Sequence, residues 1–94
     1  MKVKNMANKN GRAVPDQFVI TDSRDTRYFQ SYESIIVKIP VNGKFSSDKM
    51  YYEPIELDEK YWNYSKTISR YRNQFLGETK KETQAKINSG EYID

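Results

Sequence analysis

The chain contains no cysteine and no histidine among its 94 residues. Disulfide bonds, zinc sites built from Cys and His, cysteine nucleophiles and histidine-activated serine nucleophiles are therefore excluded, as is a histidine pH switch. No stretch approaches the roughly 20 consecutive apolar residues of a membrane-spanning helix. The charged N-terminal segment is not followed by the apolar run of a signal peptide, so we expect a cytoplasmic protein.

Aliphatic residues are scarce as well, because Leu, Ile, Val and Phe together make up only about a fifth of the chain, a fraction at the boundary of disorder. Eight Tyr and one Trp compensate, since these large side chains bury much surface while keeping one polar group. We therefore expect a folded chain, and its length allows one small domain.

The net charge of +3 is unevenly distributed along the sequence. Residues 1–14 contain four basic residues and no acidic one, residues 15–58 contain more acidic than basic residues, and residues 59–94 contain more basic than acidic ones. Basic segments can contact phosphate groups. A solvated arm and an ordinary charged helix face have the same composition, so charge alone leaves both interpretations open.

The first half of the chain is predicted to form a flexible arm and three strands. Residues 1–16 are polar and rich in Asn and Lys, which is typical of a flexible basic arm, and residues 17–94 are assigned to a single domain. Runs rich in β-branched and aromatic residues predict strands at 18–21, 27–39 and 50–57. Consecutive strands of this kind favour an antiparallel meander.

One part of the second strand has a competing interpretation. Residues 32–39 are also compatible with a short helix, and their periodicity does not separate the two. The following residues 40–49 are predicted to be a loop, with Asn42-Gly43 as its turn signal.

A sustained helical pattern follows the strands. Apolar side chains recur at spacings of three and four, at Tyr61, Tyr64, Ile68, Tyr71 and Phe75. Asp58 is the expected N-cap, and Gly77 is placed to end the helix in a left-handed conformation.

A second, shorter helix is predicted from its capping residues. Thr79 and Glu82 have the spacing of a capping box, and Ser89-Gly90 is expected to end the helix. The predicted fold is therefore α+β: a three-stranded antiparallel β-meander packed by one amphipathic helix and a short second helix.

The first helix has a basic face opposite its apolar stripe. We predict nucleic-acid contacts for the basic residues Lys66, Arg70, Arg72, Lys80 and Lys81. Arg72 lies closer to the stripe, where an ion pair with Glu53, Glu56 or Asp58 is the alternative.

Aromatic residues outside the stripe define a second candidate surface. Trp62 lies off the apolar face of the helix, and residues of this type are common at protein interfaces. We predict partner binding through Trp62, Tyr51 and Tyr52, with packing against the arm or the second helix as the alternative for Trp62.

The sequence gives no indication of an enzyme. Its four glycines are isolated, so no phosphate-binding loop is present, and its carboxylates do not repeat as in a calcium loop. No tyrosine has a catalytic partner at an informative spacing. We expect no catalytic residue, no metal and no cofactor.

Two motifs resemble those of a known family. Residues 28–36 (YFQSYESII) and 61–67 (YWNYSKT) are similar to the patterns FQSYxS and W[DN]YSxT of small uncharacterised proteins from phages, plasmids and conjugative elements of Gram-positive bacteria. Phe75-Leu76 matches the end of the family's aromatic and basic helix, whereas Asn63 stands where the family usually has Asp. The resemblance covers residues 17–77 and implies an origin in a mobile element rather than a particular activity.

Two functions follow as hypotheses. The first is a non-enzymatic phage or mobile-element accessory protein that binds nucleic acid or a nucleic-acid-handling complex in the host cytoplasm. The second is an anti-defence inhibitor of the anti-CRISPR type, which binds a host nuclease or defence protein. Homo-oligomerisation through a strand edge is a further possibility.

Overall fold

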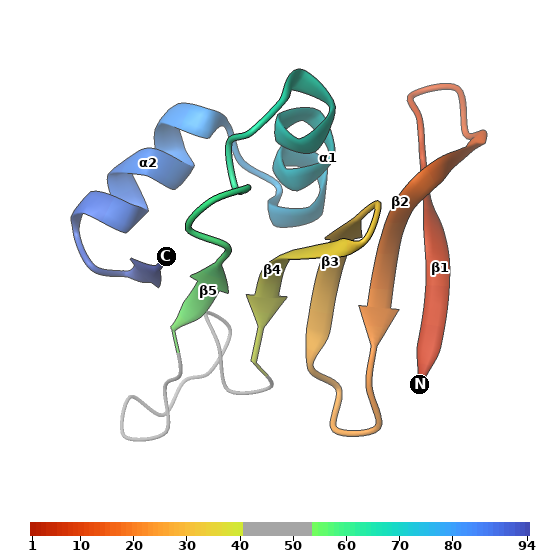
Figure 1. The fold of residues 1–94 in the computed structure, drawn as a ribbon, viewed down its shortest axis with the longest axis horizontal. Coiled ribbons are helices and arrows are strands. Elements are labelled where there is room, and N and C mark those ends of the chain that lie inside the picture. The colour runs from red at the N-terminus through yellow and green to blue at the C-terminus, as the bar shows by residue number, and fades with distance from the viewer. Residues whose placement is uncertain (41–53) are drawn as a thin grey trace.

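The computed structural model describes residues 1–40 and 54–94, which form one mixed sheet and two helices (Figure 1). The sheet has six strands in chain order: β1 (Lys2–Ala7), β2 (Ala13–Thr21), β3 (Arg27–Ser31), β4 (Ser34–Ile39), β5 (Ile55–Leu57) and β6 (Tyr92–Ile93). Neighbouring strands are antiparallel, except that β5 and β6 are parallel. The fold is α+β as predicted, but the three-stranded meander is wrong, because the sheet has six strands.

The N-terminal residues account for part of this difference. The segment predicted to be a flexible basic arm forms β1 and the start of β2, which pair from Lys2 opposite Thr21 to Ala7 opposite Ala13. Most side chains of β1 are exposed, so its backbone hydrogen bonds rather than an apolar face hold it in the sheet. A strand of this kind leaves little hydrophobic pattern in the sequence.

The predicted second strand is two strands joined by a tight hairpin. Residues 32–39 are β-strand from Ser34 onward, so the competing helix is not formed. Tyr32, which lies in the hairpin turn, adopts a left-handed conformation with φ of 54°. Its N–H donates to the carbonyl oxygen of Asp16 at 2.7 Å, which ties the hairpin to β2.

The remaining strand predictions are partly confirmed. The segment at 18–21 is the second half of β2, and the turn after it is held by the Asp22 carboxylate, which accepts from the N–H groups of Arg24 and Thr26. Of the predicted strand at 50–57, Ile55–Leu57 is β5. The loop with Asn42-Gly43 and residues 50–53 lie outside the described residues.

The two helices are α1 (Lys66–Leu76) and α2 (Lys80–Asn88). Gly77 ends α1 with φ of 69°, as predicted. The capping box of α2 is also confirmed: the Thr79 hydroxyl accepts from the Glu82 N–H, and the Glu82 carboxylate accepts from the Thr79 N–H.

The start of α1 differs from the prediction. Asp58 caps a turn instead of the helix, since its carboxylate accepts from the N–H groups of Lys60 and Tyr61. The N-cap of the helix lies seven residues later, at Ser65, whose hydroxyl accepts from the Ile68 N–H. Tyr64 consequently lies before the helix and is 68% exposed, although the spacing placed it in the apolar stripe.

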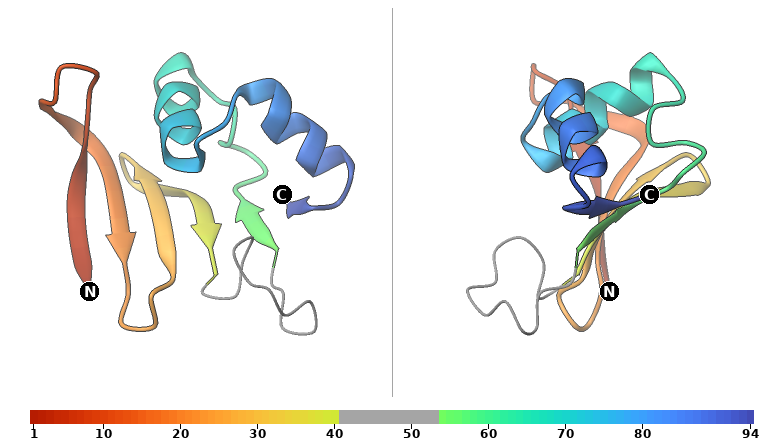
Figure 2. Two further views of the ribbon diagram at one scale, coloured as in Figure 1. Left: turned by 180° about the vertical axis from the view of Figure 1, so that it is seen from behind. Right: turned by 90° about the vertical axis from the view of Figure 1, so that its left-hand side faces the viewer.

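The core lies between the sheet and the helices. Its buried apolar residues are Met6, Phe29, Ile36, Val37, Ile39, Ile55, Leu57, Ile68, Tyr71, Leu76 and Tyr92. Phe75 of α1 stacks on Phe29 of β3 with 6.0 Å between ring centroids, which holds the helix against the centre of the sheet. Both helices lie at the end of the sheet opposite the N-terminus and the β2–β3 turn (Figure 1 and Figure 2).

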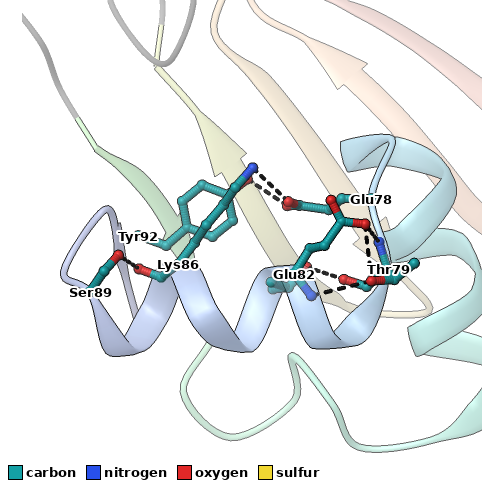
Figure 3. Close-up of polar contacts among 7 residues, drawn as sticks. Glu78, Thr79, Glu82, Lys86, Ser89 and Tyr92 are labelled. Atoms are coloured by element: carbon teal, nitrogen blue, oxygen red, sulfur yellow. Dashed lines mark hydrogen bonds and ion pairs between the residues drawn. The ribbon is translucent and has the colours of Figure 1, made fainter.

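A buried carboxylate joins α2 to the last strand. Glu78, between the two helices, accepts a hydrogen bond from the Tyr92 hydroxyl at 2.5 Å and an ion pair from the Lys86 ammonium at 2.7 Å (Figure 3). Its side chain is 3% exposed. The hydrogen bond to Glu78 raises the pKa of Lys86, so the ammonium is stabilised in its charged form. This cluster fixes β6 and α2 relative to the end of α1.

Candidate nucleic-acid interface

Three predicted basic residues lie around one shallow depression, which we call the basic hollow. Lys66 and Arg70 of α1 line it together with Lys80, the first residue of α2. The hollow has a volume of about 540 Å³, and the rest of its lining consists of Asn63, Tyr64, Ser65, Ser69 and Asn73. The lining thus contains three cations and no carboxylate.

The local structure explains why these three residues converge. Lys66 and Arg70 are four residues apart, so they lie one above the other on the same face of α1. The left-handed turn at Gly77 reverses the chain and brings the start of α2 back toward this face. The side chains of Lys66, Arg70 and Lys80 are exposed.

Within the described part of the chain, the cations of the hollow have no ion-pair partner. Among residues 1–40 and 54–94, the ion pairs join Lys38 to Glu56 and Lys86 to Glu78, and none involves a residue of the hollow. Their positive charge is therefore available to an anionic ligand.

The positive surface continues toward the β1–β2 loop. Arg70 also lines a second depression, of about 720 Å³, whose other wall includes Lys9 and the neighbouring Asn8 and Asn10. The Gln74 amide donates to the carbonyl oxygen of Ala7 at 2.9 Å, which fixes this loop against α1. Arg70 is thus the central residue of a surface that reaches from α2 to the first hairpin.

Two other predicted residues are not part of the hollow. Lys81 is exposed on α2 but does not contribute to the lining. Arg72 is fully buried, so its guanidinium is not on a surface that nucleic acid contacts in this conformation. We therefore leave Arg72 out of the candidate interface.

Arg72 instead holds the turn before α1. Its Nη1 donates to the carbonyl oxygen of Trp62, its Nη2 donates to the Asn73 side chain at 2.8 Å, and its guanidinium lies 5.1 Å from the centroid of the Trp62 ring. Burial lowers the pKa of Arg72, and the charge of Glu78 partly opposes this. Of the alternative ion-pair partners Glu53, Glu56 and Asp58, Glu56 pairs with Lys38 and Asp58 caps the preceding turn, whereas Glu53 lies outside the described residues.

The predicted aromatic surface is only partly described. Trp62 is half-buried, packs against the core and lies against Arg72, rather than against an N-terminal arm. Tyr51 and Tyr52 lie outside the described residues. The structure instead exposes Tyr64 beside the hollow and Tyr32 in the β3–β4 turn.

A residue that the sequence did not single out lies next to the hollow. Gln17 of β2 is fully buried, and neither its Oε1 nor its Nε2 has a hydrogen-bond partner among the described residues. It contributes to a cavity of about 270 Å³ between the start of β2 and α1, which Lys66 and Arg70 also line. Nothing in the local pattern marks Gln17, because its burial depends on the position of α1.

A further cavity, of about 560 Å³, has a different character. Its lining combines Tyr32, Tyr61 and Tyr64 with the acidic residues Asp16 and Glu33. Carboxylates repel phosphate, so the surface that suits phosphate ends at this cavity.

The described part of the chain offers no metal centre and no membrane-spanning helix. Within residues 1–40 and 54–94, no three His, Cys, Asp or Glu side chains are grouped so as to hold a metal ion. No helix in the same ranges is long and apolar enough to cross a membrane.

The fold and the hollow define a small α+β protein with a positively charged helical surface. The chain belongs to a family of unknown function, DUF8033, which matches residues 1–92. The match includes β1 and the start of β2, and so extends beyond the residues 17–77 that the two motifs spanned. No curated protein and no solved structure matches the chain.

Proposed function

We propose that this protein is a non-enzymatic accessory protein of a phage, plasmid or conjugative element that binds nucleic acid in the bacterial cytoplasm. The observation that carries the proposal is the basic hollow, where Lys66, Arg70 and Lys80 converge from two helices on a lining without carboxylates. The origin is proposed from the resemblance of residues 28–36 and 61–67 to motifs of mobile-element proteins.

The hollow suits a phosphate backbone more than a single small anion. It is shallow and continues past Arg70 toward Lys9, so successive phosphates can be contacted along one path. The amides of Asn63 and Asn73 and the hydroxyl of Ser65 add hydrogen-bonding groups of the kind that contact phosphate and sugar.

The proposal makes a quantitative prediction about salt. Neutralising about three phosphates of a single strand gives a slope of about −2 for the logarithm of affinity against the logarithm of salt concentration. Between about 50 and 200 mM salt, the affinity should therefore fall roughly 20-fold.

The test is a fluorescence anisotropy titration of labelled single-stranded DNA, double-stranded DNA and RNA over a salt series. The double variant Lys66→Glu/Arg70→Glu should lose binding while remaining folded. Its matched control is Lys2→Glu/Arg24→Glu, which has the same change in net charge at the start of β1 and in the β2–β3 turn, away from the helices (Figure 1). This control should bind like the wild type at moderate salt. Absence of wild-type binding at low salt, or equal losses in the two double variants, contradicts the proposal.

We place nucleic acid before the alternative of an anti-defence inhibitor. Trp62, one of the three aromatic residues assigned to that role, is engaged by Arg72. Its contacts support a role in holding the turn before α1.

A further inference from the structure

The amide of Gln17 is an unusual feature of the interior. Gln17 is fully buried, with both polar atoms of its side chain unpaired among the described residues. Its partner across the β2–β3 ladder, Ser31, is 2% exposed, and its Oγ is also unpaired. An unpaired buried polar group costs about 1–3 kcal/mol, and native proteins satisfy nearly all of them. These atoms are therefore candidate contacts for a polar ligand, which reaches them only if neighbouring side chains move, because the atoms have almost no exposed surface.

The backbone around these residues is also strained. Asp16 and Tyr32, the sequence neighbours of Gln17 and Ser31, both have left-handed backbones, with φ of 64° and 54°. Such conformations of non-glycine residues cluster at ligand-binding sites. Here they are linked by the hydrogen bond from the Tyr32 N–H to the Asp16 carbonyl.

The cavity beside Gln17 connects these observations to the basic hollow. Its volume is about 270 Å³, and its lining includes the aromatic residues Tyr32 and Tyr71. Lys66 and Arg70 line both this cavity and the hollow. A nucleotide whose phosphate lies at these two cations therefore has its base within reach of the cavity.

We propose that the cavity binds one unstacked base of a single-stranded nucleic acid, with the Gln17 amide hydrogen-bonded to the edge of that base. This inference rests on the proposed function and specifies that the bound nucleic acid is single-stranded. An amide presents a donor and an acceptor side by side, which is the arrangement that pairs with the N6 and N7 atoms of adenine. The exposed Tyr32 provides a ring for stacking. Bases within a duplex are stacked and paired, so they do not enter.

The test uses short single-stranded oligonucleotides on the full chain at low salt. One is fully abasic, one carries a single adenine, and one carries purine, which lacks the exocyclic amine, in its place. Stacking of one base and its hydrogen bonds should strengthen wild-type binding about tenfold over the abasic strand. The adenine strand should bind several-fold more tightly than the purine strand, because only adenine offers the donor for Gln17.

The variant Gln17→Met keeps the length of the side chain and removes the amide. It should bind the abasic strand as the wild type does and lose the difference between adenine and purine. Its unfolding midpoint should be unchanged or higher, since two unpaired polar atoms are removed. The matched control is Gln84→Met, the same substitution on α2 outside this cavity and outside the basic hollow, which should retain the preference for adenine.

The outcomes separate this inference from the proposed function. Equal wild-type binding of all three strands overturns the base site while leaving the phosphate surface intact. A preference for adenine that persists in Gln17→Met places the base elsewhere and also overturns it. If the wild type binds none of the strands, the proposed function itself fails. The wild-type comparison of adenine with purine can refute the contact with Gln17 without any variant, because equal binding of these two strands overturns it.

Discussion

Arg70 and Arg72 lie two residues apart on α1, yet the structure gives them opposite roles. Arg70 is exposed and lines the basic hollow, whereas Arg72 is buried beneath the turn that precedes the helix. Replacing each in turn by Met removes the same charge from the same helix. We predict that Arg72→Met lowers stability strongly and that Arg70→Met lowers nucleic-acid binding.

The size of the Arg72→Met effect follows from its contacts. The change removes the hydrogen bonds from a charged group to Trp62 and Asn73, a long one of 3.5 Å to the Ser69 hydroxyl, and the cation–π contact with the Trp62 ring. Hydrogen bonds to charged groups contribute about 1.5–3 kcal/mol each, and a cation–π contact contributes about 0.5–2 kcal/mol. Relief of the buried charge opposes this loss, since the Nε of Arg72 has no partner among the described residues. We expect a net loss of about 2–4 kcal/mol from a total of about 5–14 kcal/mol for a domain of this length.

The assay can use the intrinsic fluorescence of Trp62, because the chain contains one tryptophan. Urea unfolding followed at this residue should show a midpoint lower by about 1–3 M in Arg72→Met, given typical slopes for small domains. A midpoint within about 0.3 M of the wild type would refute the account of Arg72 as a structural residue.

The matched variant supplies the control. Arg70→Met should change the unfolding free energy by no more than about 0.5 kcal/mol, as is usual for exposed positions. It should nevertheless weaken binding to single-stranded DNA at low salt. The slope of the logarithm of affinity against the logarithm of salt concentration should become shallower by the contribution of about one phosphate contact. A large stability loss in Arg70→Met would contradict the assignment of a binding role to Arg70 and a structural role to Arg72.

Two further predictions concern the end of α1 and the cluster behind it. Gly77→Ala should cost about 1–2 kcal/mol in urea unfolding, because the left-handed backbone disfavours a Cβ although the space around it is open; an unchanged midpoint would contradict this cap. Lys86→Met should reduce stability at neutral pH by about 2 kcal/mol, because the buried Glu78 loses its cation while Tyr92 still donates to it. The folded pKa of Lys86 is raised above 10.5, so its contribution is fully present below that pH and is lost as the pH rises through the folded value. The unfolding free energy of the wild type should therefore fall more steeply above pH 10.5 than that of Lys86→Met, and parallel pH curves would contradict the role of the pair.

The helix ends that sequence reasoning predicted correctly are those determined by neighbouring residues. Gly77 and the pair Thr79 and Glu82 act within one turn of the backbone, so their spacing is sufficient. The start of α1 was placed too early because Asp58 and Ser65 are both good caps, and the aromatic spacing continues through the turn between them. The turn between the two caps is held by a hydrogen bond from the buried guanidinium of Arg72 to the Trp62 carbonyl, which the spacing of residues does not reveal.

The strands were harder to predict for a related reason. β1 pairs through its backbone and exposes most of its side chains, so its sequence resembles that of a flexible arm. The β3–β4 hairpin turns at Tyr32 without Gly, Pro or Asn, and its left-handed conformation is supported by a hydrogen bond from another part of the chain. Neither feature follows from local propensity.

The candidate site shows the same division. The basic face with Lys66 and Arg70 follows from helical spacing, whereas the convergence of Lys80 with it depends on the reversal at Gly77. The burial of Arg72 and the unpaired amide of Gln17 depend on how α1 lies on the sheet. Helical spacing identifies the charged face of α1, but it does not show which residue near that face is buried in the core.

The order of the strands has a consequence for how the protein folds. Each of the first four strands pairs with its successor, so most of the sheet closes through short loops and has low contact order. The parallel pairing of β5 with β6 is different, because α1 and α2 lie between these two strands in the sequence. The pairing therefore joins residues that are far apart along the chain. This topology favours rapid formation of the antiparallel part, with the docking of α2 and β6 as a later step. The cluster around Glu78 would then be among the last contacts to form and the first to open in local unfolding.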